Sequence, residues 1–378
     1  MIERLIAFDT TSRSSNLHLI EFVEDYVRAH GLEPKRIPNA DGTKSNLLIT
    51  LGPNEPGGII LSGHTDVVPV DDQPWDTDPF KVVEKDGKLY GRGTSDMKTF
   101  SAVALALLPE FVKRKVKTPI HIALSYDEEV GCLGVRPMIA DIVKTLPRPK
   151  LAIIGEPTDM KVVNAHKGIR SFRTTVTGRE AHSSQTDKGV NAVMVAAELI
   201  MHLDKLAEEM RERGDPSGRF DPPYTTVQSS TIEGGTALNI LARHCTFQWE
   251  FRYLPGTSRD DIVDRFVAHT QEKVLPRLRR IAPEADIVTK PRAHVPALVA
   301  VDGCPAEAFA KQLTGRNHAE AVAYGTEAGL FQEAGIPSVV CGPGNILQAH
   351  KPNEFIELSQ VDACVTFMRR LMDQVCAG

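Results

Sequence analysis

The chain has 378 residues, of which 42% are hydrophobic and 25% charged, and its formal net charge is -5. This composition is typical of soluble globular proteins and excludes collagen-like, coiled-coil and disordered chains. Nucleic-acid-binding proteins usually carry a basic excess, so the mild negative charge predicts a small-molecule substrate and no nucleic-acid partner. The length predicts about two to three domains.

The N-terminal segment has apolar residues at helical spacing, but charged residues such as Glu3, Arg4 and Glu21 interrupt them. It therefore lacks the apolar core of a secretory signal, and no stretch approaches the roughly 20 apolar residues of a membrane span. We expect a cytoplasmic protein without a membrane partner. The six cysteines are scattered without a C-x-x-C pair, which predicts neither a thiolate zinc site nor a disulfide framework.

The first part of the chain alternates helical and strand patterns. Helical periodicity covers residues 17–30, 99–113 and 136–145. Apolar, strand-like runs lie between these segments, in SNLLITLG, GGIILSGHTDVVPV, PIHIALSYDEE and KLAIIGEP. Apolar strands separated by helices predict an α/β domain whose sheet is covered by helices on both faces.

The middle of the chain has a different pattern. IRSFRTTVTGREAHSS and HCTFQWEFRYLPG alternate apolar and polar residues with a period of two, beside helical stretches at 192–213 and 260–275. This indicates an α+β unit with an antiparallel sheet. The core-like pattern then returns, with helices near 305–313 and 359–376. We therefore predict a catalytic domain formed by residues 1–168 and 292–378, with a second domain, 169–291, inserted into it.

Polar side chains follow the ends of the predicted strands. Ligands of α/β sheets bind outside the carboxyl ends of the strands, so we expect these side chains to converge at one edge. A single histidine there is more often structural, and paired acids usually begin a solvated helix. Together, imidazoles and carboxylates without thiolates suit zinc or a similar divalent ion, and the excess of acids indicates two ions. The set comprises His64, Asp66, Asp96, Asp127, Glu128, Glu129, Glu156 and His350.

Six motifs in this order carry a resemblance to a known family: LSGHTDVVPV, YGRGTSDMK, YDEEVGCLG, IIGEPT, GREAHSS and QAHKPNEF. They resemble the di-zinc metallopeptidase family that includes acetylornithine deacetylase, succinyl-diaminopimelate desuccinylase, aminoacylase and glutamate-releasing carboxypeptidases. The resemblance implies a mixed-sheet, zinc-peptidase-like catalytic domain and an inserted α+β dimerisation or lid domain. YDEEVGCLGV and GPGNILQAHKPNEFI are most similar to the acetylornithine deacetylase branch.

The resemblance also implies the role of each metal-site residue. His64, Asp96 and Glu156 would bind one ion, and Asp96 would bridge to a second ion bound by Glu129 and His350. Glu128 would be the general base, and Asp66 would accept a hydrogen bond from the His64 ring and so orient it. The resemblance further implies a cis peptide bond after Asp96. Zinc is the expected metal, for which cobalt can substitute.

Substrate contacts are expected from the inserted domain. The resemblance implies that His182 reaches the active site of the neighbouring subunit of a homodimer and contacts the carbonyl oxygen; a turn residue beside Ser183 is the alternative. Asn239 and Arg252 resemble residues that hold the substrate's α-carboxylate, although Arg252 could equally be an exposed sheet arginine. The acid partner of an ornithine ammonium stays open between Asp72, Glu327 and others.

The hypothesis that results is a metal-dependent amidohydrolase of arginine biosynthesis that cleaves the acetyl amide of N-acetyl-L-ornithine. A desuccinylase or aminoacylase of the same family is the first alternative, because a fold does not determine a substrate. An inactive binding paralogue is the second. A paralogue without activity would be expected to lack some of the polar set, and all of that set is present.

Overall fold

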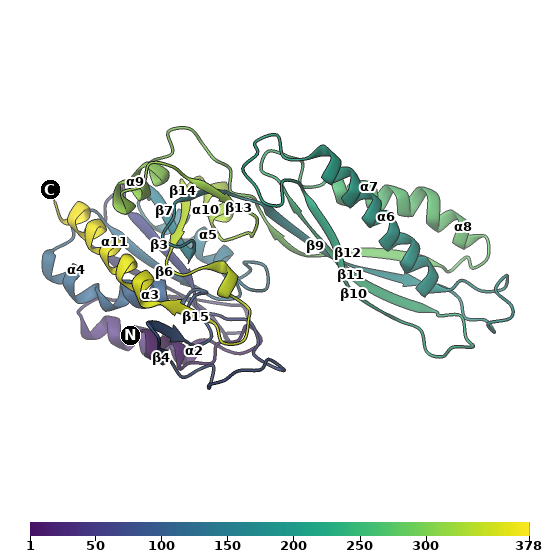
Figure 1. Ribbon diagram of the computed structural model, residues 1–378, viewed down its shortest axis with the longest axis horizontal. Helices are drawn as coiled ribbons and strands as arrows, with labels where there is room; N and C mark the ends of the chain where they lie inside the picture. Colours follow the sequence, from purple (N-terminus) through teal and green to yellow (C-terminus); the bar gives the residue numbers. More distant parts are fainter. Residues whose placement is uncertain (378) are drawn as a thin grey trace. The chain divides into compact units, whose positions relative to one another are not determined.

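The computed structural model describes residues 1–377, and the chain folds into two compact units (Figure 1). Unit 1 comprises Met1–Ala165, Leu298–Ala321 and the chain from Thr326 onward. Unit 2 comprises His166–Ala297 and Val322–Gly325. The chain therefore builds most of unit 1, then most of unit 2, and then returns to complete unit 1, except for the short segment Val322–Gly325.

The sheet of unit 1 has eight strands in the order β1-β2-β6-β3-β7-β14-β8-β13. β3 pairs in parallel with β6 and β7, and β14 pairs in parallel with β7, whereas β2 is antiparallel to β1 and β6. Every residue of β3, β6 and β7 is buried, as expected for parallel strands covered on both faces. The strands are β1 (Lys35–Pro38), β2 (Ser45–Leu51), β3 (Ile59–His64), β6 (Ile120–Ser125), β7 (Leu151–Pro157), β8 (Val163–His166), β13 (Glu320–Val322) and β14 (Ser338–Gly342).

Helices bury the apolar side chains of this sheet. Leu61 of β3 lies in one core cluster with Phe100 of α3 and Leu371 of α11, which excludes water from the strands that lead to the candidate site. The predicted α/β catalytic fold is therefore confirmed. The helices of unit 1 are α1 (Ile2–Ile6), α2 (Leu17–Ala29), α3 (Lys98–Ala106), α4 (Leu108–Arg114), α5 (Val135–Thr145), α9 (Pro305–Thr314), α10 (Ala328–Glu333), the 3₁₀ turn η2 (Ile346–Gln348) and α11 (Leu358–Cys376).

A small three-stranded sheet, in the order β15-β5-β4, also belongs to unit 1. It is formed by β4 (Val83–Lys85), β5 (Lys88–Tyr90) and β15 (Phe355–Glu357), and its pairing places Phe355 opposite Tyr90. Sequence periodicity did not predict these strands, because each has only three residues. The pairing matters for the site because it brings the segment after β5 beside the segment before β15.

Unit 2 is an α+β domain with a four-stranded antiparallel sheet in the order β10-β11-β9-β12. The burial of β11 alternates with a period of two, and its inward side chains include Phe247, Trp249 and Phe251. The predicted open-faced sheet with helices is confirmed. Its elements are β9 (Gly168–Thr177), α6 (Ala192–Arg213), β10 (Thr226–Gly234), β11 (His244–Tyr253), α7 (Asp261–His269), the π-helical turn η1 (Thr270–Val274), α8 (Leu275–Arg279) and β12 (Asp286–Val295).

Two predicted helices are each divided in the structure, and a proline lies at each division. The helix expected over 99–113 ends at Ala106, and α4 begins at Leu108 with Pro109 in its first turn. The helix expected over 260–275 passes through η1 before α8, which has Pro276 in its first turn. Proline has no N–H to donate and its ring crowds the preceding turn, so a helix tolerates it only near a new start.

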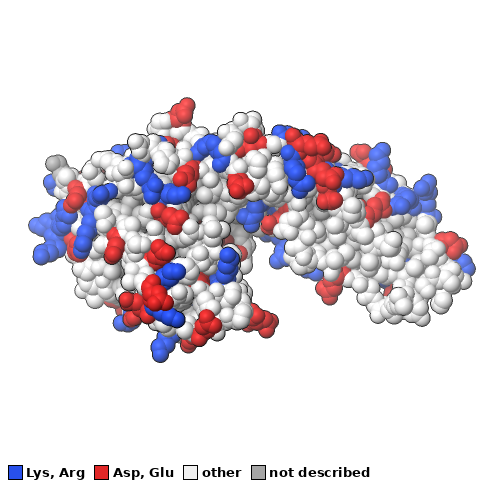
Figure 2. All heavy atoms as spheres, viewed as in Figure 1, with Lys and Arg blue, Asp and Glu red and all other residues white. Residues whose placement is uncertain are grey.

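Acidic and basic side chains are interspersed on the visible face of both units (Figure 2). This mixture agrees with the small net charge of -5. Among the described helices, none combines the length and the apolar character needed to cross a membrane.

Candidate metal centre

His64 ends the buried central strand β3, and its side chain is 1% exposed. Its Nδ1 lies 2.9 Å from the main-chain oxygen of Asp66, which can only accept a hydrogen bond, so Nδ1 carries a proton. Nε2 points the other way, 3.1 Å from Asp96 Oδ1 and 3.7 Å from Glu156 Oε1. The ring therefore presents its other nitrogen to two carboxylates, which is the orientation that a metal-binding histidine needs.

Asp96 lies between two histidines. Its Oδ1 faces His64, and its Oδ2 lies 3.2 Å from His350 Nε2. The same His350 nitrogen is 3.0 Å from Glu129 Oε2. One carboxylate thus directs each of its oxygens at a different imidazole, as a carboxylate shared by two cations would. The peptide bond from Asp96 to Met97 is cis, which confirms that expectation.

Glu128 and Glu156 complete the cluster from two other strand ends. Glu156 lies near the end of β7, and Glu128 follows β6 in the loop that also carries Glu129. In the described chain, two groups of three side chains have ligand atoms within 4.8 Å of one another: one is His64, Glu128 and Glu156, and the other is His64, Asp96 and Glu129. The convergence expected at one edge of the sheet is therefore observed for these residues and His350, whereas Asp127 of the expected set forms an ion pair with Lys44.

Three glutamates of the cluster have raised pKa values. Burial is the main cause in each case, and neighbouring carboxylates add to it. The pKa of Glu128 rises to about 8 and that of Glu129 to about 7, and the pKa of Glu156 also rises. Each acid is harder to ionise mainly because burial removes water from its carboxylate, and the negative charge of the neighbouring acids adds to this effect.

The histidines show the complementary effect. Hydrogen bonds to Asp96 and Glu129 raise the pKa of His350 to about 10. Burial alone would lower the pKa of His64, but Glu156 and Asp96 raise it well above its usual value. Burial would raise the pKa of Asp96, yet the two histidines hold it well below its usual value. A cluster of this kind favours added positive charge, and its imidazole and carboxylate donors fit divalent ions such as zinc.

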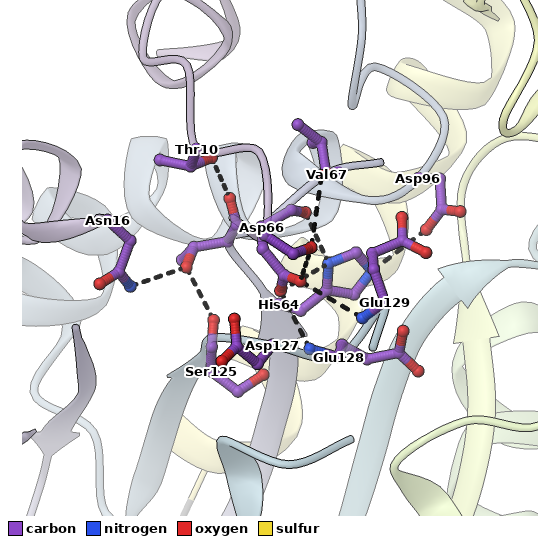
Figure 3. A network of polar contacts seen from close by, with 12 residues as sticks. Thr10, Asn16, His64, Asp66, Val67, Asp96, Ser125, Asp127, Glu128 and Glu129 are labelled. Carbon is purple, nitrogen blue, oxygen red and sulfur yellow. Dashed lines mark hydrogen bonds and ion pairs between the residues drawn. The ribbon is translucent and has the colours of Figure 1, made fainter. Parts of the chain in front are cut away.

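The carboxylate of Asp66 makes contacts that differ from the expectation. The His64 ring donates to the main-chain oxygen of Asp66, while Asp66 Oδ1 lies 3.6 Å from Nδ1 (Figure 3). The carboxylate instead accepts from the main-chain N–H groups of Glu128, at 3.1 Å, and Glu129, at 3.3 Å, and from the Ser12 hydroxyl at 2.7 Å. Asp66 therefore orients His64 through its backbone and holds the loop of the two glutamates through its side chain.

Glu327 lies buried near the cluster, with 1% of its surface exposed. Ser62 Oγ donates to it at 3.0 Å and Ser125 Oγ donates to its other oxygen. Ser62 is on β3 and Ser125 ends β6, so two strands of the sheet hold this carboxylate. Glu327 is one of the candidates for the acid partner of a substrate ammonium. In the structure each of its two oxygens already accepts a hydrogen bond from a serine hydroxyl. Asp72, the other named candidate, is exposed and has a positive φ of 58°.

Sequence reasoning missed two charged residues beside the cluster, Arg92 and Glu354. Both are buried, and Glu354 accepts from the main-chain N–H of Asp96 at 3.1 Å. Both stand inside motifs that carried the family resemblance, YGRGTSDMK and QAHKPNEF. The sequence did offer one indication of their importance: each is a charged residue inside a motif whose other residues had been given a role.

Three predicted substrate-contact residues belong to unit 2. His182 is exposed and forms a bridge with Ile240, and Ser183 N donates to Asn239 O at 3.0 Å, so His182 and Asn239 lie on adjacent segments. His182 Nδ1 accepts the N–H of Ser184 at 3.2 Å, so the neutral ring carries its proton on Nε2. Arg252 is on β11, and its Nε donates to Glu250 at 3.3 Å.

The sequence pattern described as peptidase family M20/M25/M40 matches residues 60–374. The acetylornithine deacetylase of Proteus mirabilis is 37% identical over 98% of this chain and 93% of its own length. That of Photorhabdus laumondii is 36% identical, again over 98% of this chain and 93% of its own length. The known proteins thus share sequence with both units.

Solved structures share the fold at lower sequence identity. An M20 family metallo-carboxypeptidase from Sulfolobus solfataricus superimposes with a TM-score of 0.76 at 16% identity, over 99% of this chain and 98% of that one. A dinuclear metal binding peptidase of the M20 family from Bacillus subtilis gives 0.66 at 15% identity, over 100% and 96% of the two chains. These comparisons support the fold.

Proposed function

This chain belongs to the peptidase family M20/M25/M40, and we propose that it uses two zinc ions to hydrolyse N-acetyl-L-ornithine to L-ornithine and acetate. The observation that carries the proposal is the cluster in which Asp96 directs one oxygen at His64 and the other at His350. Relatives at 36% and 37% identity named acetylornithine deacetylase support the choice of substrate. The reaction is a step of arginine biosynthesis.

In this proposal His64, Asp96 and Glu156 would hold one ion, and Asp96, Glu129 and His350 would hold the other. Cobalt can substitute, because it accepts similar ligands. When bound in such a site, divalent ions supply Lewis-acid chemistry: they polarise a carbonyl group and lower the pKa of water. The remaining work belongs to side chains that move protons and hold the substrate.

Glu128 is the proposed general base. Its carboxylate takes the proton of the attacking water, and it then gives that proton to the amine that leaves when the amide bond breaks. Burial raises its pKa to about 8, and positive charge held nearby would lower that pKa. The group is therefore suited to accept and return one proton near neutral pH. The products are acetate and the free amino group of ornithine.

His182 is the proposed donor to the carbonyl oxygen. Its Nε2–H can donate a hydrogen bond to the oxygen as negative charge develops there. We propose that it acts in a second copy of this chain, within a homodimer. Its surroundings support this role, because Leu238 and Ile240 beside it are exposed apolar residues and β10 lies at an edge of its sheet. Asn239 and Arg252 are the proposed contacts of the α-carboxylate.

A substrate panel tests the proposal. Purified protein is supplied with Zn²⁺ or Co²⁺ and offered N-acetyl-L-ornithine, succinyl-diaminopimelate and N-acetylmethionine at matched concentrations, with free amine as the readout. We expect turnover of acetylornithine well above the other two. A preference for succinyl-diaminopimelate or acetylmethionine would identify another N-acyl amino acid hydrolase. Absence of turnover on all three, together with well under one zinc per chain, would favour an inactive binding paralogue.

A further inference from the structure

Arg92 and Glu354 form a buried ion pair beside the candidate metal centre. Arg92 Nη1 lies 2.8 Å from Glu354 Oε2, and the two side chains are 1% and 0% exposed. The pairing of Phe355 with Tyr90 and a hydrogen bond of 2.9 Å from Gly91 N to Glu354 O hold the two segments side by side. Burying two charges is costly, and further hydrogen bonds to both groups offset part of that cost.

The Glu354 carboxylate organises the loop that carries Asp96. It accepts the main-chain N–H groups of Gly93, at 3.1 Å, Ser95, at 2.8 Å, and Asp96, at 3.1 Å. Gly93 has a φ of +86°, which favours glycine. A Cβ at this position would lie 2.9 Å from a Val67 side-chain atom and 3.2 Å from a Lys98 side-chain atom, so the loop packs closely here. The loop thus wraps tightly around one carboxylate, and its last residue is the aspartate shared by the two histidines.

Arg92 extends the same network to the loop that carries His350. Its Nη2 donates to Gln73 Oε1 at 2.6 Å, and its Nη1 lies 3.3 Å from the main-chain oxygen of Lys351. Gln73 Nε2 then donates to the main-chain oxygen of His350 at 3.2 Å. A continuous series of hydrogen bonds therefore joins the backbone of Asp96 to the backbone of His350.

His350 depends on this network more than the other residues of the cluster do. Its side chain is 54% exposed and its φ is +62°, so it has neither core packing nor a favoured backbone conformation to fix it. Asp96, by contrast, is 7% exposed. The distance between these two side chains, 3.2 Å between Oδ2 and Nε2, must therefore be maintained from the backbone side.

We propose that Arg92, Glu354 and Gln73 are positioning residues that fix Asp96 relative to His350 and thereby set the affinity of the cluster for its second divalent ion. The inference rests on the proposed function only in taking Asp96 and His350 as metal ligands. It does not depend on which amide is hydrolysed.

Titration of metal-free protein with Co²⁺ tests this role. Equilibrium dialysis gives the affinities, and the visible absorption of bound Co²⁺ reports its coordination geometry. Outer residues that orient metal ligands typically change affinity by 10–100-fold when mutated. For Glu354→Gln we expect a loss of about that size at the weaker site, with an altered spectrum. Gln73→Ala removes the link to His350 together with the oxygen that accepts from Arg92 Nη2 and Trp75 Nε1, and for this variant we expect a loss of several-fold.

Glu24→Gln is the matched control. Glu24 is also a buried carboxylate of unit 1, and it accepts from Arg36 Nε at 2.7 Å and from Nη2 at 2.5 Å. This variant should lower the melting temperature without changing Co²⁺ affinity or the spectrum. If Glu354→Gln does not fold, Gln73→Ala, whose side chain lies at the surface of the network, still decides the question.

Wild-type affinity and spectrum in the folded variants would overturn the inference while leaving the proposed function intact. Wild-type protein that binds two ions but does not hydrolyse acetylornithine would overturn the substrate proposal alone. Wild-type protein that binds no Co²⁺ would overturn both.

Discussion

The candidate metal centre in unit 1 and the predicted substrate contacts in unit 2 are built in opposite ways. In unit 1, His64 and Asp96 are buried. The main-chain oxygen of Asp66 fixes the His64 ring, and the Glu354 carboxylate accepts from the main-chain N–H of Asp96. In unit 2, His182 is exposed, and its ring is held only locally by Ser184. In the proposed function, unit 1 therefore organises cation binding, whereas His182 is proposed to act only when substrate and a second copy of the chain are present.

The largest effect is expected from Glu128→Gln. An amide cannot take the proton of water, so kcat should fall by about 10³-fold while the metal content stays at its wild-type value. Steady-state kinetics and metal analysis of the same sample measure both. Glu84→Gln, on the small strand β4, is the control and should keep both values. Substantial turnover by Glu128→Gln would show that Glu128 is not the general base.

His182→Asn should lower kcat by about 10²-fold, because the shorter asparagine amide does not reach the position of the imidazole Nε2–H and the developing oxyanion loses that donor. The comparison between the units predicts unchanged metal content and an unchanged melting temperature. His244→Asn, at another exposed histidine of unit 2, is the matched control and should be as active as wild type. Loss of metal from His182→Asn would show that unit 2 also contributes to metal binding, contrary to the comparison of the two units.

Asp66→Asn tests the unit 1 side of the comparison. The asparagine keeps the main-chain oxygen that orients His64, but its amide group replaces one of the two oxygens that accept from Glu128 N and Glu129 N. We expect about 10-fold weaker Co²⁺ binding, measured by dialysis, because the loop of the two glutamates loosens. Unchanged affinity would show that this loop does not need the carboxylate.

An effect similar in size to that of Asp66→Asn, but on KM, is expected from Arg252→Lys. If Arg252 pairs with the α-carboxylate, lysine retains the charge but loses the bidentate geometry, so KM should rise about 10-fold with little change in kcat. Arg173→Lys, on the exposed side of β9, should leave KM unchanged. Equal KM values for the two variants would indicate that Arg252 is an exposed sheet arginine that does not contact the substrate.

Local sequence patterns were sufficient for much of the fold and for the acids and histidines of the site. β3, β6 and β7 are continuous apolar runs, and parallel strands must end at one edge, so His64, the residues after Ser125 and Glu156 could be placed together in advance. The alternation in β11 likewise identified a one-sided sheet. Both the continuous apolar runs and the alternation lie within a few neighbouring residues and can therefore be recognised in the sequence.

Other features depend on pairs that are distant in sequence. Arg92 and Glu354 are 262 positions apart, so neither local pattern predicts that one neutralises the other. The ring of His64 and the carboxylate of Asp66 are close in sequence, but the contacts of that carboxylate depend on N–H groups 62 and 63 positions away. The direction of a side chain depends on which hydrogen-bond donors and acceptors surround it, and folding brings these groups together from distant parts of the sequence.

The most direct test of the central claim is acetylornithine turnover by one sample before chelation, after chelation, and as Zn²⁺ or Co²⁺ is returned, with bound metal counted per chain. The account predicts that turnover disappears with the metal and returns as about two ions bind, as expected of a two-metal site. Full turnover by protein that retains well under one ion per chain would contradict it.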